Sequence, residues 1–85
     1  MIKLVFEKQA WDELNWWLHN DPKIARKILE LITSISLNPF LGTGKPEPLK
    51  ANYRGYWSRR ITQEHRLVYK IEDDFILILS AKGHY

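Results

Sequence analysis

Three residues in this sequence have side chains that together could carry out acid–base chemistry on a phosphodiester. Glu47 lies in the segment KPEPLK, Arg66 lies in the segment TQEHRLVY, and His84 stands next to Tyr85 in the segment AKGHY. A carboxylate can accept a proton, a histidine can donate one near neutral pH, and an arginine can stabilise charge on phosphate oxygens. Metal-free cleavage of RNA requires these three functions. The residue types therefore permit such a reaction, provided that the fold brings them together.

The segment KPEPLK presents its glutamate from a stiff stretch of backbone. Pro46 and Pro48 restrict Lys45 and Glu47 to extended conformations, which holds the carboxylate between two lysines. One interpretation is a general base at a catalytic site. The other is an ordinary surface glutamate in local ion pairs, which contribute little to stability. Taken alone, the segment favours the second interpretation.

Arg66 and His84 also have two interpretations each. Arg66 and Arg60 fall on the same face of adjacent predicted strands, where their planar guanidinium groups could bind a phosphate. Alternatively, Arg66 only pairs with a neighbouring acid on a solvated face. His84 is either the general acid or a histidine without a role. The residues by themselves leave these choices open.

Several other kinds of chemistry do not fit the sequence. There are no cysteines, which excludes disulfides, thiol nucleophiles and thiolate metal sites. The segment GTGK lacks the glycine and the Ser or Thr that a phosphate-binding loop requires. The three histidines show no metal-ligand spacing, and Asp73 and Asp74 fit a solvated hairpin turn. We therefore predict no metal site and no cofactor.

Length and charge indicate one small domain with a basic surface. The 85 residues suffice for a single domain over 1–85, and the net charge is +3. Between residues 45 and 66 the basic side chains clearly outnumber Glu47 and Glu64; they are Lys45, Lys50, Arg54, Arg59, Arg60 and Arg66. Such a cluster suits a polyanion, although a merely solvated face is equally compatible. No long apolar run or cleavable leader is evident, so we expect a cytoplasmic protein with no membrane segment.

The apolar pattern predicts an α+β fold with helices on one face of a mainly antiparallel sheet. Residues 2–6 read as a strand, and Ala10, Trp11, Leu14, Trp17 and Leu18 then form one helical stripe. A second helix begins at Pro22, with Asp21 as its cap, and ends before Pro39. Two helices joined so closely predict an antiparallel hairpin.

Three further strands follow as a meander, with the sequences YWSRRI, HRLVYKI and FILILS. Alternation predicts that Leu67, Tyr69 and Ile71 face the helices, as do Trp57 and Ile61. Arg60, Arg66 and Lys70 then belong to the opposite face. FILILS is apolar on both faces, which indicates an interior strand. The segment between the helices and the meander is predicted to be a loop or an irregular edge strand.

At KPEPLK, YWSRRITQEHRLVYKI and the final HY, the sequence strongly resembles the YoeB (Txe/YoeB) family of toxins from toxin–antitoxin systems, within the RelE-like fold. The resemblance extends over essentially the whole chain and includes the segment WDEL. It implies the order β-α-α-β-β-β with four to five strands. It also implies a ribosome-dependent endoribonuclease that cleaves mRNA in the ribosomal A site and inhibits translation. The implied partners are mRNA, the ribosome, a YefM-type antitoxin with which it represses its operon, and a second copy of the chain.

Carried over by motif, the resemblance assigns roles to individual residues. Glu47 is the expected general base, Arg66 stabilises the phosphate, His84 is the general acid, and Tyr85 completes the site. Contacts with RNA are expected from Lys45, Lys50, Arg59 and Arg60. Trp16 lies opposite Trp11 on its helix and is a candidate dimer contact.

Two alternatives belong to other functional classes. The chain could be a non-catalytic RelE-fold toxin, such as a gyrase inhibitor, or a module that only binds its antitoxin in a repressor. Glu47 and His84 together argue against both, because binding alone needs no acid and base.

Overall fold

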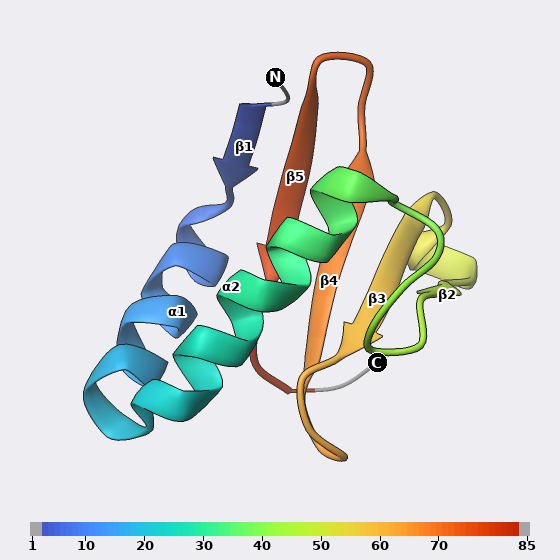
Figure 1. The fold of residues 1–85 in the computed structure, drawn as a ribbon. Coiled ribbons are helices and arrows are strands. Elements are labelled where there is room, and N and C mark those ends of the chain that lie inside the picture. Colours follow the sequence, from blue (N-terminus) through green and yellow to red (C-terminus); the bar gives the residue numbers. More distant parts are fainter. Residues whose placement is uncertain (1–2, 84–85) are drawn as a thin grey trace.

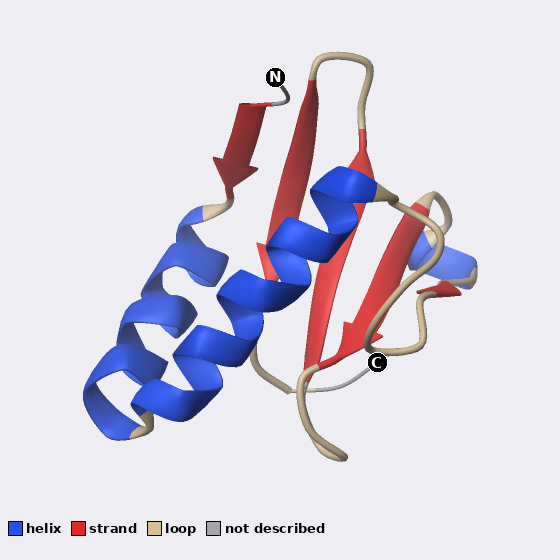
Figure 2. Ribbon diagram, in the orientation of Figure 1, coloured by secondary structure: helices blue, strands red, loops and turns tan. Residues whose placement is uncertain are grey.

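The chain folds into a two-helix hairpin packed on one face of a five-stranded sheet (Figures 1 and 2). This is a computed structural model, and it describes residues 3–83. Its elements in chain order are β1 (Lys3–Phe6), α1 (Lys8–Asn20), α2 (Pro22–Leu37), β2 (Glu47–Pro48), the short 3-10 helix η1 (Ala51–Tyr53), β3 (Tyr56–Arg60), β4 (Arg66–Ile71) and β5 (Phe75–Ser80). The predicted α+β class and element order are confirmed.

The sheet has the strand order β1-β5-β4-β3-β2. The first strand pairs with β5 in parallel, whereas β5, β4, β3 and β2 are successively antiparallel. The prediction of FILILS as an interior strand is confirmed, because β5 lies between β1 and β4. The segment KPEPLK contributes the very short edge strand β2. Within the described residues, no helix is long and apolar enough to cross a membrane.

The helix boundaries follow the prolines. Helix α2 starts with Pro22 in its first turn and ends at Leu37, two residues before Pro39. The expected cap at Asp21 is only partly correct, since this residue occupies the N-cap position but its side chain forms no capping hydrogen bond. At the other end, the Asn38 side chain accepts hydrogen bonds from the backbone N–H groups of residues 40 and 41 and turns the chain toward the sheet.

The core lies between the helices and one sheet face. Leu67, Tyr69 and Ile61 are buried there, as the alternation predicted, and Trp57 and Ile71 pack against them. The stripe predicted for α1 is wider than the face that is covered. Its buried residues are Ala10, Leu14 and Trp17, whereas Trp11 is 54% exposed and Leu18 is 49% exposed. The sheet and α2 cover only part of the circumference of α1, so the rest of the stripe remains on the surface.

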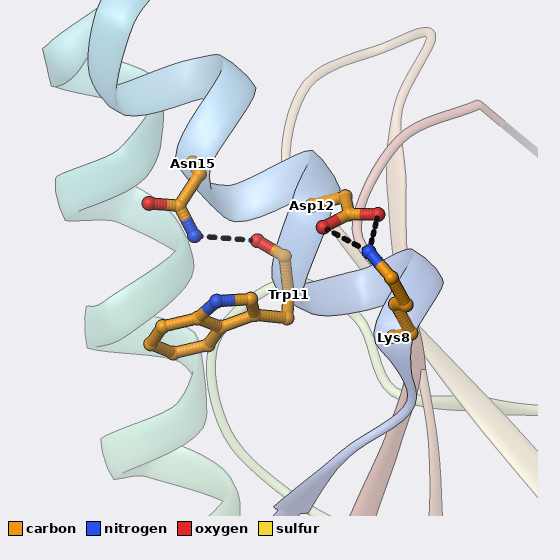
Figure 3. A network of polar contacts seen from close by, with 4 residues as sticks. All are labelled: Lys8, Trp11, Asp12 and Asn15. Atoms are coloured by element: carbon orange, nitrogen blue, oxygen red, sulfur yellow. Dashed lines mark hydrogen bonds and ion pairs between the residues drawn. The ribbon is translucent and has the colours of Figure 1, made fainter.

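The outer face of α1 carries local polar contacts among Lys8, Trp11, Asp12 and Asn15 (Figure 3). Lys8 Nζ forms an ion pair with Asp12 at 2.9 Å, and Asn15 Nδ2 donates to the backbone oxygen of Trp11 at 2.8 Å (Figure 3). Both contacts join residues four apart on one helix, and such exposed pairs contribute little to stability.

Arg59 is fully buried, with 0% of its surface exposed. Its guanidinium donates to the Tyr69 hydroxyl, to the Ser34 hydroxyl, and to the backbone oxygens of Asn38, Leu41 and Thr43, at distances of 2.7–3.2 Å. The five N–H donors of an arginine are thereby satisfied. The prediction that Arg59 contacts RNA is wrong, because no part of the side chain reaches the surface. Its charge instead ties α2 and the loop over residues 38–43 to the sheet.

Replacing Arg59 should therefore destabilise the fold strongly. Arg59→Met keeps much of the volume but leaves several buried carbonyl and hydroxyl groups without a donor, at a cost of about 3–5 kcal/mol in the free energy of unfolding. Urea denaturation measures this cost. Arg26→Met, on the exposed side of α2, is the matched control and should change the free energy by less than about 0.5 kcal/mol. Equal effects of the two substitutions would contradict the role of Arg59.

Tyr69 makes the stability contributed by the Arg59 cluster dependent on pH. Its hydroxyl accepts from Arg59 and donates to the Pro39 backbone oxygen at 2.7 Å. Burial raises the pKa of Tyr69 above its ordinary value of 10.0, and the hydrogen bond and charge of Arg59 partly oppose this shift. The unfolded chain therefore loses this proton at lower pH than the folded chain. The associated stability is complete below pH 10.0 and is lost as the pH rises through the folded-state pKa.

This coupling gives a second expected outcome. Between neutral pH and the region above the ordinary tyrosine pKa, the free energy of unfolding should fall more steeply for the wild type than for Tyr69→Phe. At neutral pH the variant should itself be less stable by about 1–3 kcal/mol, because Arg59 Nε loses its acceptor. Denaturation curves across this pH range measure both effects. Parallel pH dependences for the two proteins would show that Tyr69 does not contribute.

Candidate functional site

Strand register brings Glu47, Arg60 and Arg66 to one face of the sheet. Glu47 is paired with Ser58 across β2 and β3, and Arg60 lies two residues beyond Ser58 on the same face. Arg60 is in turn paired directly with Arg66 across β3 and β4. Arg59, between Ser58 and Arg60, points to the opposite, helix-covered face, where it is buried. The three charged residues therefore share the face that the helices leave open.

The two facing arginines make this surface strongly electropositive. Like charges directly opposite each other on adjacent strands destabilise a sheet. In addition, the Nε atoms of Arg60 and Arg66 are both buried, and neither has a hydrogen-bond partner within the described part of the chain. Buried donors without acceptors are costly and uncommon in folded proteins. This arrangement suits an anion with several oxygens, such as a phosphate, which can accept from both guanidinium groups.

The loop before β2 is shaped by glycine. The backbone oxygen of Gly44 accepts from Arg60 N at 2.7 Å, and Gly44 has a φ of +83°. A Cβ atom there would lie 2.9 Å from the Leu31 side chain and 3.1 Å from that of Arg59. Only glycine fits this close approach of the loop to the sheet. Gly44 in the segment GTGK thus has a packing role.

The backbone around Glu47 is held in unusual conformations on both sides. Lys45 has a φ of 51° and Ala51 a φ of 56°, values that cost non-glycine residues on the order of 1 kcal/mol each. The prediction that Pro46 restricts Lys45 to an extended conformation is therefore wrong, because the Lys45 backbone is left-handed. Beyond β2, Leu49 N donates to the Tyr56 backbone oxygen at 2.9 Å and continues the pairing with β3. Glu47 is exposed between these constraints, as are Lys45 and Lys50. The carboxylate and both lysines are therefore accessible at the sheet edge.

Aromatic residues that the motif analysis did not select flank this edge. The rings of Tyr53 and Tyr56 meet edge to face at 6.3 Å, and Lys70 Nζ lies 5.4 Å from the centre of the Tyr56 ring. A cavity of about 350 Å³ is lined by Pro48, Leu49, Lys50 and Tyr53. The segment ANYRGYW, in which Arg54 lies between Tyr53 and Tyr56, was the available signal, since aromatic residues close to a basic one are typical of surfaces that bind single-stranded nucleic acid.

The end of the described chain lies against the strand that carries Arg66. The Arg66 backbone N–H donates to the Gly83 oxygen at 2.7 Å, and Gly83 has a φ of +85°. His84 and Tyr85, the predicted general acid and its neighbour, follow Gly83 and lie outside the described residues. Among residues 3–83, no group of three or more potential ligand side chains is placed to hold a metal ion.

Solved structures with the same fold define the class of this protein. A structure described as the YoeB dimer from Staphylococcus aureus superposes with a TM-score of 0.93, is 47% identical, and covers 99% of this chain and 98% of its own. A YoeB–YefM complex from the same organism gives a TM-score of 0.91 at 45% identity, with 100% and 99% coverage. The fold and its basic sheet face therefore place the chain among the RelE-like toxins.

The sequence comparison narrows this class to one family. Residues 6–85 match the family described as the YoeB-like toxin of bacterial type II toxin–antitoxin systems. Toxin YoeB of Escherichia coli K12 is 50% identical over 84 residues, which is 99% of this chain and 100% of the relative. The chain belongs to the YoeB-like toxin family, and the family resemblance noted in the sequence is confirmed.

The facing arginines predict an unusual stability effect. Because Arg66 repels Arg60 and leaves a buried donor unsatisfied, Arg66→Gln should leave the free energy of unfolding unchanged or raise it by up to about 1 kcal/mol at low salt. Added inorganic phosphate should stabilise the wild type more than the variant. Thermal unfolding with and without phosphate measures both effects. Arg26→Gln, on the exposed side of α2, controls for net charge, and a clear loss of stability in Arg66→Gln would contradict the repulsion.

Proposed function

We propose that this chain is a ribosome-dependent endoribonuclease that cleaves mRNA in the ribosomal A site and thereby inhibits translation. The proposal starts from the membership of this chain in the YoeB-like toxin family. The observation that carries it is the shared sheet face of Glu47, Arg60 and Arg66, which supplies a carboxylate beside a paired guanidinium site. A surface used for binding alone would gain nothing from a carboxylate that repels RNA.

The proposed reaction is an internal transfer at the phosphodiester. Glu47 accepts the proton of the ribose 2′-OH, whose oxygen attacks the adjacent phosphorus and forms a new P–O bond. Arg66, with Arg60 beside it, stabilises the negative charge that develops on the phosphoryl oxygens. His84 donates a proton to the departing 5′ oxygen as the P–O bond to it breaks. The products are a 2′,3′-cyclic phosphate and a 5′-hydroxyl end, and no cofactor takes part.

The remaining predicted site residues serve RNA binding in this proposal. Lys45 and Lys50 are exposed at the edge that carries Glu47 and attract the RNA backbone. Tyr85 stacks on a base or orients the RNA next to His84. A site with so few groups depends on correct substrate geometry, and the ribosome would supply it by holding the mRNA in an extended form. Such a target implies that the protein acts in the cytoplasm.

Two protein partners complete the proposal. The relative from Staphylococcus aureus is described both as a dimer and in complex with YefM. We propose that this chain likewise forms a homodimer and is neutralised by a YefM-type antitoxin, with which it represses its operon. The basic sheet face suits an acidic, extended antitoxin segment that excludes RNA. Trp16, which is 44% exposed, remains the proposed dimer contact.

Cleavage of a translated message by purified protein tests the chemistry. Glu47→Gln removes the base and Arg66→Ala removes the phosphate contact, so each should lower the cleavage rate by about 100-fold or more. Deleting His84 and Tyr85 should also abolish cleavage without unfolding the protein. The matched control is Glu30→Gln, an exposed glutamate on α2, which should cleave like the wild type. Mass spectrometry of the products should find the cyclic phosphate.

Several outcomes would contradict the proposal. If all three site variants cleave like the wild type, the assigned residues are wrong. If the wild type halts growth while messages remain intact, the protein is a non-catalytic toxin. DNA damage in place of message loss would instead indicate gyrase as its target.

A further inference from the structure

Side chains of α1 hold the segment that follows β5. The strand ends at Ser80, and the next residue, Ala81, is bonded through both of its backbone polar groups. Ala81 N donates to Glu13 Oε1 at 2.7 Å, and Trp17 Nε1 donates to the Ala81 oxygen at 2.9 Å. Lys82 Nζ lies 3.6 Å from the centre of the Trp16 ring. Residues 81 and 82 are thus held by side chains of α1 directly after the chain leaves the sheet.

His65 holds the next part of the same segment. Gly83 N donates to His65 Nδ1 at 2.9 Å, while the Gly83 oxygen accepts from the backbone N–H of Arg66. The His65 ring packs edge to face on Trp17 at a centroid distance of 4.9 Å. The backbone N–H of His65 donates to Thr62 Oγ1 at 3.1 Å, which fixes the start of β4. Both backbone polar groups of Gly83 are therefore held by two consecutive residues, 65 and 66.

The direction of the hydrogen bond defines the state of His65. A backbone N–H can only donate, so Nδ1 must be an unprotonated acceptor and the ring proton lies on Nε2. The ring is neutral in this arrangement. A proton on Nδ1 would face the Gly83 N–H, and the contact would be lost. The contact is thus a specific acceptor interaction in addition to the ring packing.

We propose that His65 is a positioning residue, which fixes the backbone of Gly83 and thereby the position at which His84 begins. This proposal rests on the proposed function of His84 as the general acid. Consecutive Cα atoms are about 3.8 Å apart, so a fixed Gly83 restricts where the next residue can begin. By holding Gly83 beside Arg66, His65 lowers the entropy that the acid would lose on reaching the phosphate.

A pair of substitutions separates the acceptor from the rest of the side chain. In His65→Asn, the amide Oδ1 occupies the place of Nδ1 on Cγ and can accept from Gly83 N. In His65→Leu, the volume is similar and the ring contact is replaced by an apolar one, but there is no acceptor. Both variants lose the edge-to-face packing on Trp17, so this loss cancels when they are compared with each other.

Two measurements on the full-length chain test the proposal. Hydrogen exchange of the Gly83 amide, followed by NMR, should be protected in the wild type and His65→Asn but not in His65→Leu. The single-turnover rate of message cleavage at saturating toxin should fall about 100-fold in His65→Leu and recover most of this loss in His65→Asn. The toxin concentration at half-maximal rate should stay the same, because the RNA-binding face is intact. His19→Leu, on the exposed end of α1, is the matched control and should match the wild type.

The two readouts keep this proposal distinct from the proposed function. If the wild type does not cleave RNA, the proposed function fails, and the catalytic part of this inference fails with it, while the Gly83 exchange still reports the contact. If the wild type cleaves RNA and His65→Leu cleaves equally fast, His65 is not a positioning residue. Equal losses in His65→Leu and His65→Asn would assign His65 to ring packing alone and would also overturn the proposal.

Discussion

The buried guanidinium of Arg59 is the interaction on which the rest of the molecule depends. A cation placed in a protein interior is unstable unless its donors are satisfied, and here each of them has an acceptor. These acceptors come from α2, from the loop that follows it and from β4. One side chain therefore joins segments that are distant in sequence. A domain of 85 residues has a limited apolar core. The hydrogen bonds of Arg59 therefore do much to fix how α2, the loop after it and the sheet pack together.

The candidate site is built on the other side of the same strand. Since side chains alternate along β3, the residues on either side of Arg59 are turned to the open face of the sheet, and Arg60 is among them. The loop that Arg59 holds leads directly into β2, which carries Glu47. By holding this loop from the core side, Arg59 helps to position the Glu47 carboxylate on the opposite face of the sheet. The core and the candidate site therefore lie on opposite sides of one short strand.

Several features around the open face of the sheet cost stability. Arg60 opposes Arg66, two Nε donors are buried without partners among the described residues, and Lys45 and Ala51 have left-handed backbone conformations. None of these features helps the chain to fold. A phosphate that accepted from both guanidinium groups would satisfy the two Nε donors. Hydrogen bonds with Glu13, Trp17 and His65 hold residues 81–83 at the end of the described chain.

The sequence by itself determined the local structure and the types of residues at the site. Apolar periodicity and prolines defined both helices, alternation assigned Leu67 and Tyr69 to the core, and the motifs selected Glu47 and Arg66. Only the tertiary structure decided which of two consecutive arginines is buried. Alternation already put Arg59 on the face of Trp57 and Ile61, but arginines are rarely buried, and the acceptors that make it possible assemble only on folding. The tertiary structure alone also decided that Trp11 is exposed and that His65 contacts Gly83. Local patterns report the conformation of neighbouring residues, whereas burial and hydrogen-bond partners depend on segments that meet in space.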